Sequence, residues 1–190
     1  MQLTSSERFD QFIGTQLAEA VLPRTTLDFD AELALWHRNL DIFYKFVESS
    51  LSPYVEDGRV LVRYGEVQIR EALIGVYRAR CAQLHIGRDE VTLTPVGTLL
   101  RSSRGQINMK GPHGSARFVV VPPEVSRRWT RADNPLWYGE PGDENSAPET
   151  WIWKLAMPQR DTTFIHVDAE FFQEALMGVT AGIRLDDDDR

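Results

Sequence analysis

The residues of this chain that could bind a partner through charge are arginines, concentrated in its middle. Between Gly58 and Arg131 there are 13 arginines or lysines against five aspartates or glutamates, whereas the two flanks hold eight basic and 23 acidic residues. Most of the cations are arginines, 18 against three lysines. A planar guanidinium suits paired hydrogen bonds to phosphate or carboxylate, although a GC-rich genome would favour arginine as well. The layout predicts a basic surface for an acidic protein or a phosphate-bearing ligand.

The most strongly basic part runs from Pro95 to Arg131, where seven cations face one acid, Glu124. Arginines interleaved with aromatic residues are typical of single-stranded nucleic-acid grooves. The interpretation that we favour instead pairs many of these arginines with the acidic flanks of the same domain, because the whole chain carries a net charge of −7. The candidate binding residues are Arg101, Arg104, Arg117, Arg127, Arg128, Trp129, Arg131, Trp137 and Tyr138.

Residues for metal binding or nucleophilic catalysis show no local pattern. The four histidines are 48, 28 and 53 residues apart, so no short ligand motif occurs, and Cys81 is the only cysteine. No nucleophile motif is present either. We therefore predict no metal, no cofactor and no catalytic residue. An enzyme whose site is assembled from distant residues stays as an alternative, with the candidates His85, His113, Asp133 and Glu140.

Three function classes follow, in order of preference. The first is a non-catalytic binding or interaction module, which uses an arginine-bearing β surface and the segment 122–150. The second is the enzyme with an assembled site, and the third is a nucleic-acid accessory protein. A homodimer is left open.

Length and composition indicate one globular domain over residues 1–185, followed by an acidic disordered tail at 186–190. Nine Phe, five Trp and five Tyr exclude a disordered chain. The first residues lack the basic and apolar regions of a signal peptide, and no apolar run reaches 18 residues. With a single cysteine, these features predict a soluble, cytoplasmic, bacterial-type protein without membrane contact.

Two helices are expected at the start of the chain, as a hairpin over residues 5–51. The first covers about 6–22. The second covers about 28–51, with Thr26 or Asp28 as its N-cap and Ser52-Pro53 as its end. Apolar residues spaced alternately by four and three mark its buried seam. These are Phe29, Leu33, Trp36, Leu40, Phe43 and Val47.

The β region, 58–121, shows short strands and frequent turn residues. We predict a strand at 59–64, a tight turn at Gly65-Glu66, and strands at 80–86 and 90–94 around a hairpin turn. Residues 66–77 fit a helix or a strand, and strand is preferred. Pro95 and Gly97 predict an edge strand or a bulge. Another hairpin joins 106–110 to 115–121.

The last third begins with an irregular, proline-rich segment, the long loop 122–150. Two closing strands are predicted around Met157-Pro158, and Asp168 is predicted to cap a final helix over about 169–180, within the region 151–182. Short strands at close spacing indicate antiparallel pairing. The expected fold is therefore α+β, with an antiparallel sheet of about six to eight strands, an N-terminal helical hairpin and a C-terminal helix.

Overall fold

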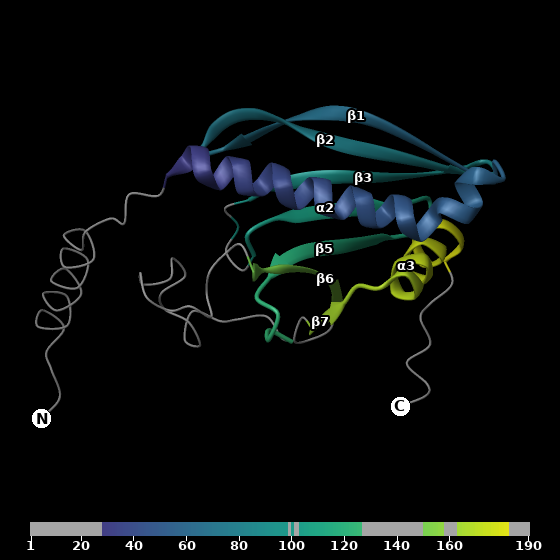
Figure 1. The fold of residues 1–190 in the computed structure, drawn as a ribbon. Helices are drawn as coiled ribbons and strands as arrows, with labels where there is room; N and C mark the ends of the chain where they lie inside the picture. Colours follow the sequence, from purple (N-terminus) through teal and green to yellow (C-terminus); the bar gives the residue numbers. More distant parts are fainter. Residues whose placement is uncertain (1–27, 99, 101–102, 127–149, 158–162, 183–190) are drawn as a thin grey trace, which may run out of the picture.

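A computed structural model describes residues 28–98, 100, 103–126, 150–157 and 163–182. Within them the chain forms an α+β fold of two helices and seven strands (Figure 1). The predicted helix over 6–22, and with it the helical hairpin, lies outside the described residues. The elements in order are α2 (Phe29–Glu56), β1 (Val60–Glu71), β2 (Gly75–Ile86), β3 (Asp89–Gly97), β4 (Gln106–Lys110), β5 (Ser115–Val121), β6 (Ile152–Met157), β7 (Thr163–His166) and α3 (Ala169–Ala181).

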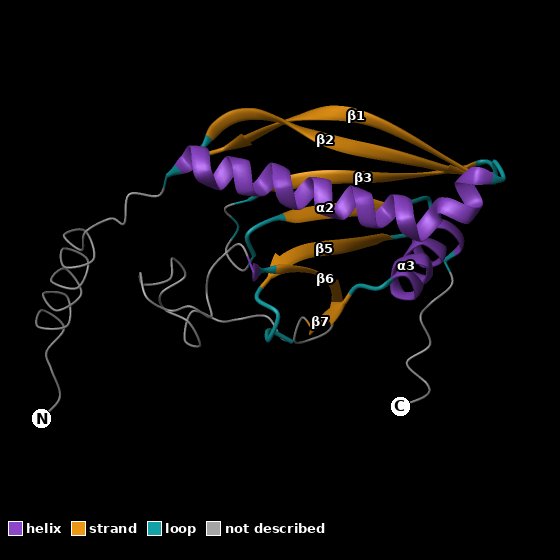
Figure 2. Ribbon diagram, viewed as in Figure 1, coloured by secondary structure: helices purple, strands orange, loops and turns teal. Residues whose placement is uncertain are grey.

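The strands form one antiparallel sheet in which each strand pairs with the next along the chain. This confirms the predicted antiparallel sheet of six to eight strands. Both helices lie on the same face of the sheet, as Figure 2 shows. We call that face the inner face and the opposite one the outer face. The described part of the chain contains no helix that is long and apolar enough to cross a bilayer.

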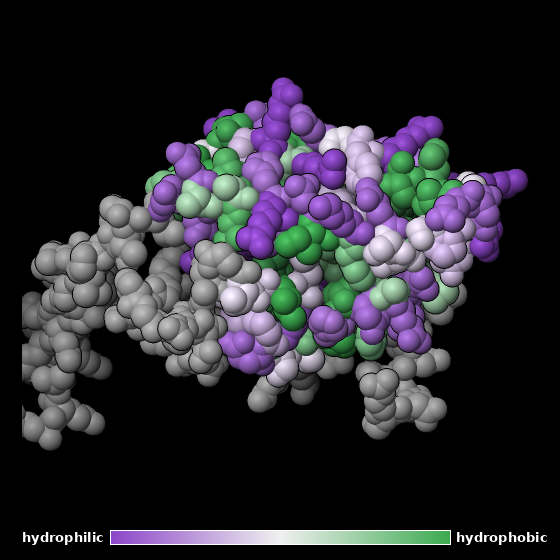
Figure 3. Space-filling model, in the orientation of Figure 1, coloured by the Kyte–Doolittle hydropathy of each residue, from purple (hydrophilic) through white to green (hydrophobic). Residues whose placement is uncertain are grey.

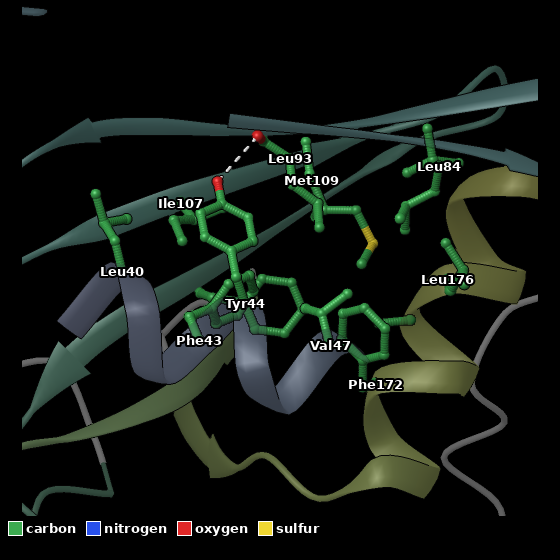
Figure 4. Packing of buried hydrophobic residues seen from close by; sticks show 14 of the residues in the cluster. Leu40, Phe43, Tyr44, Val47, Leu84, Leu93, Ile107, Met109, Phe172 and Leu176 are labelled. Carbon is green, nitrogen blue, oxygen red and sulfur yellow. Dashed lines mark hydrogen bonds between the residues drawn. The ribbon is translucent and has the colours of Figure 1, made fainter. Parts of the chain in front are cut away.

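The core lies between α2, α3 and the inner face. Four residues of the predicted α2 seam, Trp36, Leu40, Phe43 and Val47, are fully or almost fully buried. The Phe43 ring packs 5.1 Å from Phe118 and 4.9 Å from Trp153, centre to centre. Figure 4 shows Tyr44 from the same helix reaching the sheet, where its hydroxyl donates to the Leu93 carbonyl. The seam therefore positions α2 along the sheet, as its spacing predicts.

The exposed side of α2 is polar. Figure 3 shows this side of the molecule, where hydrophilic residues predominate and hydrophobic ones surface in separate groups. Large apolar side chains exposed on α2 are Phe29, Ile42 and Val55. Scattered apolar residues are normal on a folded surface, so they indicate no binding site.

The predicted end of α2 at Ser52-Pro53 is wrong, because the helix continues to Glu56 with Pro53 inside it. Proline removes one backbone hydrogen bond, yet the residues around it are held by packing. Leu51 is buried and Tyr54 packs against the core. In Figure 1 the axis of α2 turns at this end, as expected for a helix that contains proline.

The predicted turn at Gly65-Glu66 is also wrong, because β1 runs through it and pairs with β2 over its whole length. Instead, the side of β1 that faces the core changes at Gly65. The residues directed inward are Val60 and Val62 before it but Val67 and Ile69 after it. Residues 66–77 are strand on both sides of a turn at 72–74, in line with the preferred prediction.

The remaining strand predictions are largely confirmed. The hairpin of β4 and β5 has the predicted bounds, and the closing strands and α3 agree to within a few residues. The register of β3 against β4 shifts between Pro95 and Gly97, so the predicted bulge is present. The alternative of an edge position is wrong, because β3 lies third in the sheet.

Asp28 caps α2 and Asp168 caps α3, as predicted. The Asp28 carboxylate accepts hydrogen bonds from the backbone N–H groups of Asp30 and Ala31, each at 3.1 Å. We expect Asp28→Ala to lower the free energy of unfolding by about 1 kcal/mol in denaturant melts. Asp28→Asn keeps the acceptor and should stay close to wild type. Equal losses in both variants would contradict the capping role.

Candidate functional site

The outer face of the sheet carries two rows of polar side chains across strands β1 to β5. The strand registers align five residues in the first row and three in the second. The rows are two residues apart along each strand that they share. Neighbouring strands are about 4.8 Å apart, so together the rows form a compact surface. We call these residues the polar rows: Arg63, Gln83, Thr92, Lys110 and Ser115, then Thr94, Asn108 and Arg117.

Strand alternation directs these side chains outward. Leu84, Leu93, Met109 and Phe118 are fully buried in the core against the helices. Each adjoins a member of the polar rows in sequence, and successive side chains of a strand point to opposite faces. The hydrophobic effect that fixes the inner residues therefore also fixes the outward direction of the polar rows.

The polar rows contain three cations and no carboxylate. Arg63, Lys110 and Arg117 are exposed, and none of them forms an ion pair with a described residue. Lys110 and Arg117 come from adjacent strands and are diagonal neighbours, while Arg63 lies three strands from Lys110. The other members are uncharged residues that donate and accept hydrogen bonds. This surface can therefore bind an anionic group and also form hydrogen bonds with the polar atoms next to that group.

Other arginines of the basic stretch are paired within the domain. Arg59 contacts Asp57 and Arg80 contacts Asp41, both of which are acids of the N-terminal flank. Two further pairs join Arg78 to Glu66 and Arg104 to Glu32. Among the described residues, the flank thus neutralises part of the basic stretch but leaves the cations of the polar rows exposed and without an ion-pair partner. We call these three residues the open cations.

Only two of the nine predicted site residues are described, and they lie on opposite sides of the sheet. Arg117 belongs to the polar rows. Arg104 is almost fully buried, and its Nη1 donates to Glu32 Oε1 at 2.6 Å. The sheet therefore does not bring these two side chains together. Outside the described residues lie Arg101, Arg127, Arg128, Trp129, Arg131, Trp137 and Tyr138.

The start of the predicted long loop packs on the outer face beside the polar rows. Val125 joins a small apolar cluster with Val119, Val121, Ala156 and Phe164. The Nζ atom of Lys154, a buried residue of β6, donates to the carbonyls of Pro123 and Val125 at 2.5 and 2.7 Å. Burial lowers the pKa of Lys154, while nearby Glu124 acts in the opposite direction. Residues 122–126 thus border the candidate surface.

Residues of the alternative enzyme show no catalytic arrangement where they are described. His85 Nδ1 lies 3.8 Å from Glu90 Oε2 on the outer face. His113 lies in the turn between β4 and β5, and its backbone N–H donates to Val179. Asp133 and Glu140 lie outside the described residues. In the part of the chain that the structure describes, no cluster of three histidine, cysteine or acidic residues could hold a metal.

Sequence reasoning omitted most of the polar rows from its candidates. Arg63 is far in sequence from Lys110 and Arg117, and the uncharged members carry no motif. Apolar and polar residues alternate within each strand, which indicates that each strand has a polar side. Only the register between the strands shows which of these polar residues lie next to one another. The geometry offers open cations among uncharged hydrogen-bonding groups, next to an anchored loop.

Compared with known proteins, the chain matches no family model, no curated protein and no solved structure.

Proposed function

We propose that this protein is a non-catalytic binding module whose outer face contacts an acidic or phosphate-bearing partner. The observation that carries the proposal is the set of three open cations in the polar rows, which contain no acid. Exposed charges of one sign attract a partner of the opposite sign and accelerate its association. The whole chain has a net charge of −7, so this attraction is limited to the face itself.

An acidic protein segment is preferred to a single-stranded nucleic acid. Recognition of unpaired bases on a sheet relies on aromatic side chains that stack with them. The polar rows hold no aromatic residue, and the described aromatic residues of the central strands belong to the inner face. Threonine, asparagine and glutamine between the cations instead suit a carboxylate-rich segment, whose backbone offers further hydrogen bonds.

The test compares a variant of the polar rows with one of matched charge. Arg63→Gln/Lys110→Gln/Arg117→Gln removes the open cations, and Lys45→Gln/Arg59→Gln/Arg78→Gln removes three exposed cations elsewhere. Binding of polyglutamate and of single-stranded DNA would be titrated at low and physiological salt. We expect at least about tenfold weaker polyglutamate binding in the first variant only, because individual surface charge contacts contribute up to roughly 1 kcal/mol each.

The possible results separate the proposals. Equal weakening by both variants would show that only net charge matters, and the outer face would not be the site. Tight, salt-sensitive DNA binding that exceeds polyglutamate binding, and that the polar rows support, would place nucleic acid first. Melting curves of both variants check that neither substitution unfolds the domain.

A further inference from the structure

The C-terminal end of α3 lies against a turn between two strands of the polar rows. The backbone N–H of His113, in the turn between β4 and β5, donates to the Val179 carbonyl of α3 at 2.9 Å. Gly182, the C-cap of α3, adjoins the same residue, because an added Cβ would lie 3.5 Å from His113 Cβ. Figure 1 shows α3 at the end of the sheet where β5 begins. The chain therefore leaves α3 beside the turn that joins Lys110 to Ser115.

The sequence that follows Gly182 contains four consecutive aspartates, the longest run of acids in the chain. They are Asp186–Asp189, which we call the acidic run, and three residues separate them from Gly182. An extended chain spans at most about 3.3–3.6 Å per residue, so the acidic run can extend roughly 13–25 Å from Gly182. Lys110 and Arg117 are three and four residues from His113, which Gly182 adjoins. Both cations therefore lie within reach of the acidic run.

The acidic run and the open cations complement each other in charge. The polar rows contain no carboxylate, and none of the open cations forms an ion pair with a described residue. Contacts between exposed charges are individually weak. A short tether compensates for that weakness, because it holds the acidic run at an effective concentration on the order of 1 mM at the surface. We propose that the acidic run binds the open cations of the polar rows within the same chain.

This proposal rests on the proposed function, because it assigns an acidic segment of the chain itself to the same surface. A bound acidic run occupies the cations that an external partner needs, so the two compete. A partner with more carboxylates than the acidic run displaces it, whereas a weakly acidic one does not. The contact thus restricts the outer face to strongly acidic partners.

Carbodiimide crosslinking tests where the acidic run lies, because the reagent joins carboxylates to lysine amines in contact with them. The chain has three lysines, of which Lys110 belongs to the polar rows, Lys45 is exposed on α2 and Lys154 is buried. Crosslinked peptides of the monomer would be identified by mass spectrometry in dilute protein at low salt. We expect the acidic run to be joined to Lys110 far more than to Lys45, in a yield that does not depend on protein concentration.

A variant separates binding from mere proximity. Arg63→Gln/Arg117→Gln removes two open cations but keeps Lys110 as the crosslinking site. Each exposed contact contributes up to roughly a fivefold change in an equilibrium, so the yield at Lys110 should fall at least about threefold. An unchanged yield in this variant, or equal yields at Lys45 and Lys110 in the wild type, would overturn the proposal.

Competition is measured with polyglutamate. Asp186→Asn/Asp187→Asn/Asp188→Asn/Asp189→Asn removes the acidic run, and a control removes four exposed carboxylates of the two helices, as Asp30→Asn/Glu48→Gln/Glu56→Gln/Glu170→Gln. Both variants raise the net charge by four. We expect about threefold or more tighter polyglutamate binding at low salt in the first variant only, since the tethered competitor is lost. The gain should shrink as salt screens the contact.

The results distinguish this proposal from the proposed function. Equal strengthening by both four-residue variants shows that only net charge matters, and the competition is then refuted while the outer face stays a binding surface. Crosslinks at Lys110 that depend on Arg63 and Arg117, without any polyglutamate binding that the polar rows support, confirm the contact within the chain and refute the external partner. Melting curves check that each variant is folded.

Discussion

Gly105→Ala is expected to destabilise the fold strongly. Gly105 has a φ of +145°, which side-chain-bearing residues rarely adopt. An added Cβ would lie 2.9 Å from Trp36 Cε3, nearer still to Cζ3, and 3.2 Å from Val120 Cγ2. The backbone conformation costs roughly 1–3 kcal/mol. Forcing a methyl group into a packed core costs a further 1–3 kcal/mol or so. Denaturant melts should show a total loss of about 2–6 kcal/mol.

A glycine elsewhere separates the two contributions. Gly87, in the turn between β2 and β3, also has positive φ, at +62°, but an added Cβ meets nothing within 4 Å. Gly87→Ala should therefore show only the conformational cost, about 1–2 kcal/mol. If both variants lost the same stability, the close approach of Gly105 to Trp36 would have no energetic weight. The start of α2 would then be less tightly packed than the structure indicates.

Arg104→Met alone should also have a large effect, because it leaves the Glu32 carboxylate buried without its cation. Breaking one side of a buried ion pair costs about 3–5 kcal/mol. Glu32→Leu/Arg104→Met, which removes both charges, should recover most of that loss, since well-packed apolar residues often replace such pairs without penalty. Melts of the single and double variants measure the difference directly.

The exposed pair of Arg78 and Glu66 provides the comparison. The Arg78 and Glu66 side chains are 77% and 63% exposed to solvent, and Arg78 Nη1 lies 3.3 Å from Glu66 Oε2. Arg78→Met should change the unfolding free energy by only about 0–1 kcal/mol, because water screens the pair. A loss for Arg104→Met within that same range would show that the carboxylate of Glu32 finds another partner in the variant.

Local sequence signals predicted the elements whose determinants are local. The α2 seam, the caps Asp28 and Asp168, and the β4–β5 hairpin depend on residues a few positions apart, and the structure has them where expected. Two local signals misled. Proline and glycine usually interrupt regular structure, but burial of Leu51 carries the helix past Pro53, and pairing with β2 carries the strand through Gly65. In both places tertiary contacts outweigh local preference.

The candidate surfaces depend on contacts that no sequence window contains. Arg104 lies 72 residues from Glu32, and its neighbours in the chain do not distinguish a buried arginine from an exposed one. Arg63 and Lys110 share a row only because four strands pair in one particular register. The sequence could show that the middle of the chain is basic. Which cations are paired and which are open follows from the pairing of strands.

The change of face at Gly65 also bears on how the sheet ends. β1 is twelve residues long and forms one edge of the described sheet, a position that commonly invites unwanted strand addition. A straight incoming strand could align its apolar side with Val60 and Val62 or with Val67 and Ile69, but not with both halves. Arg63, Glu66 and Arg70 place charges along the same edge. We therefore expect the change of face at Gly65 to make this edge strand a poor template for fibre-like association.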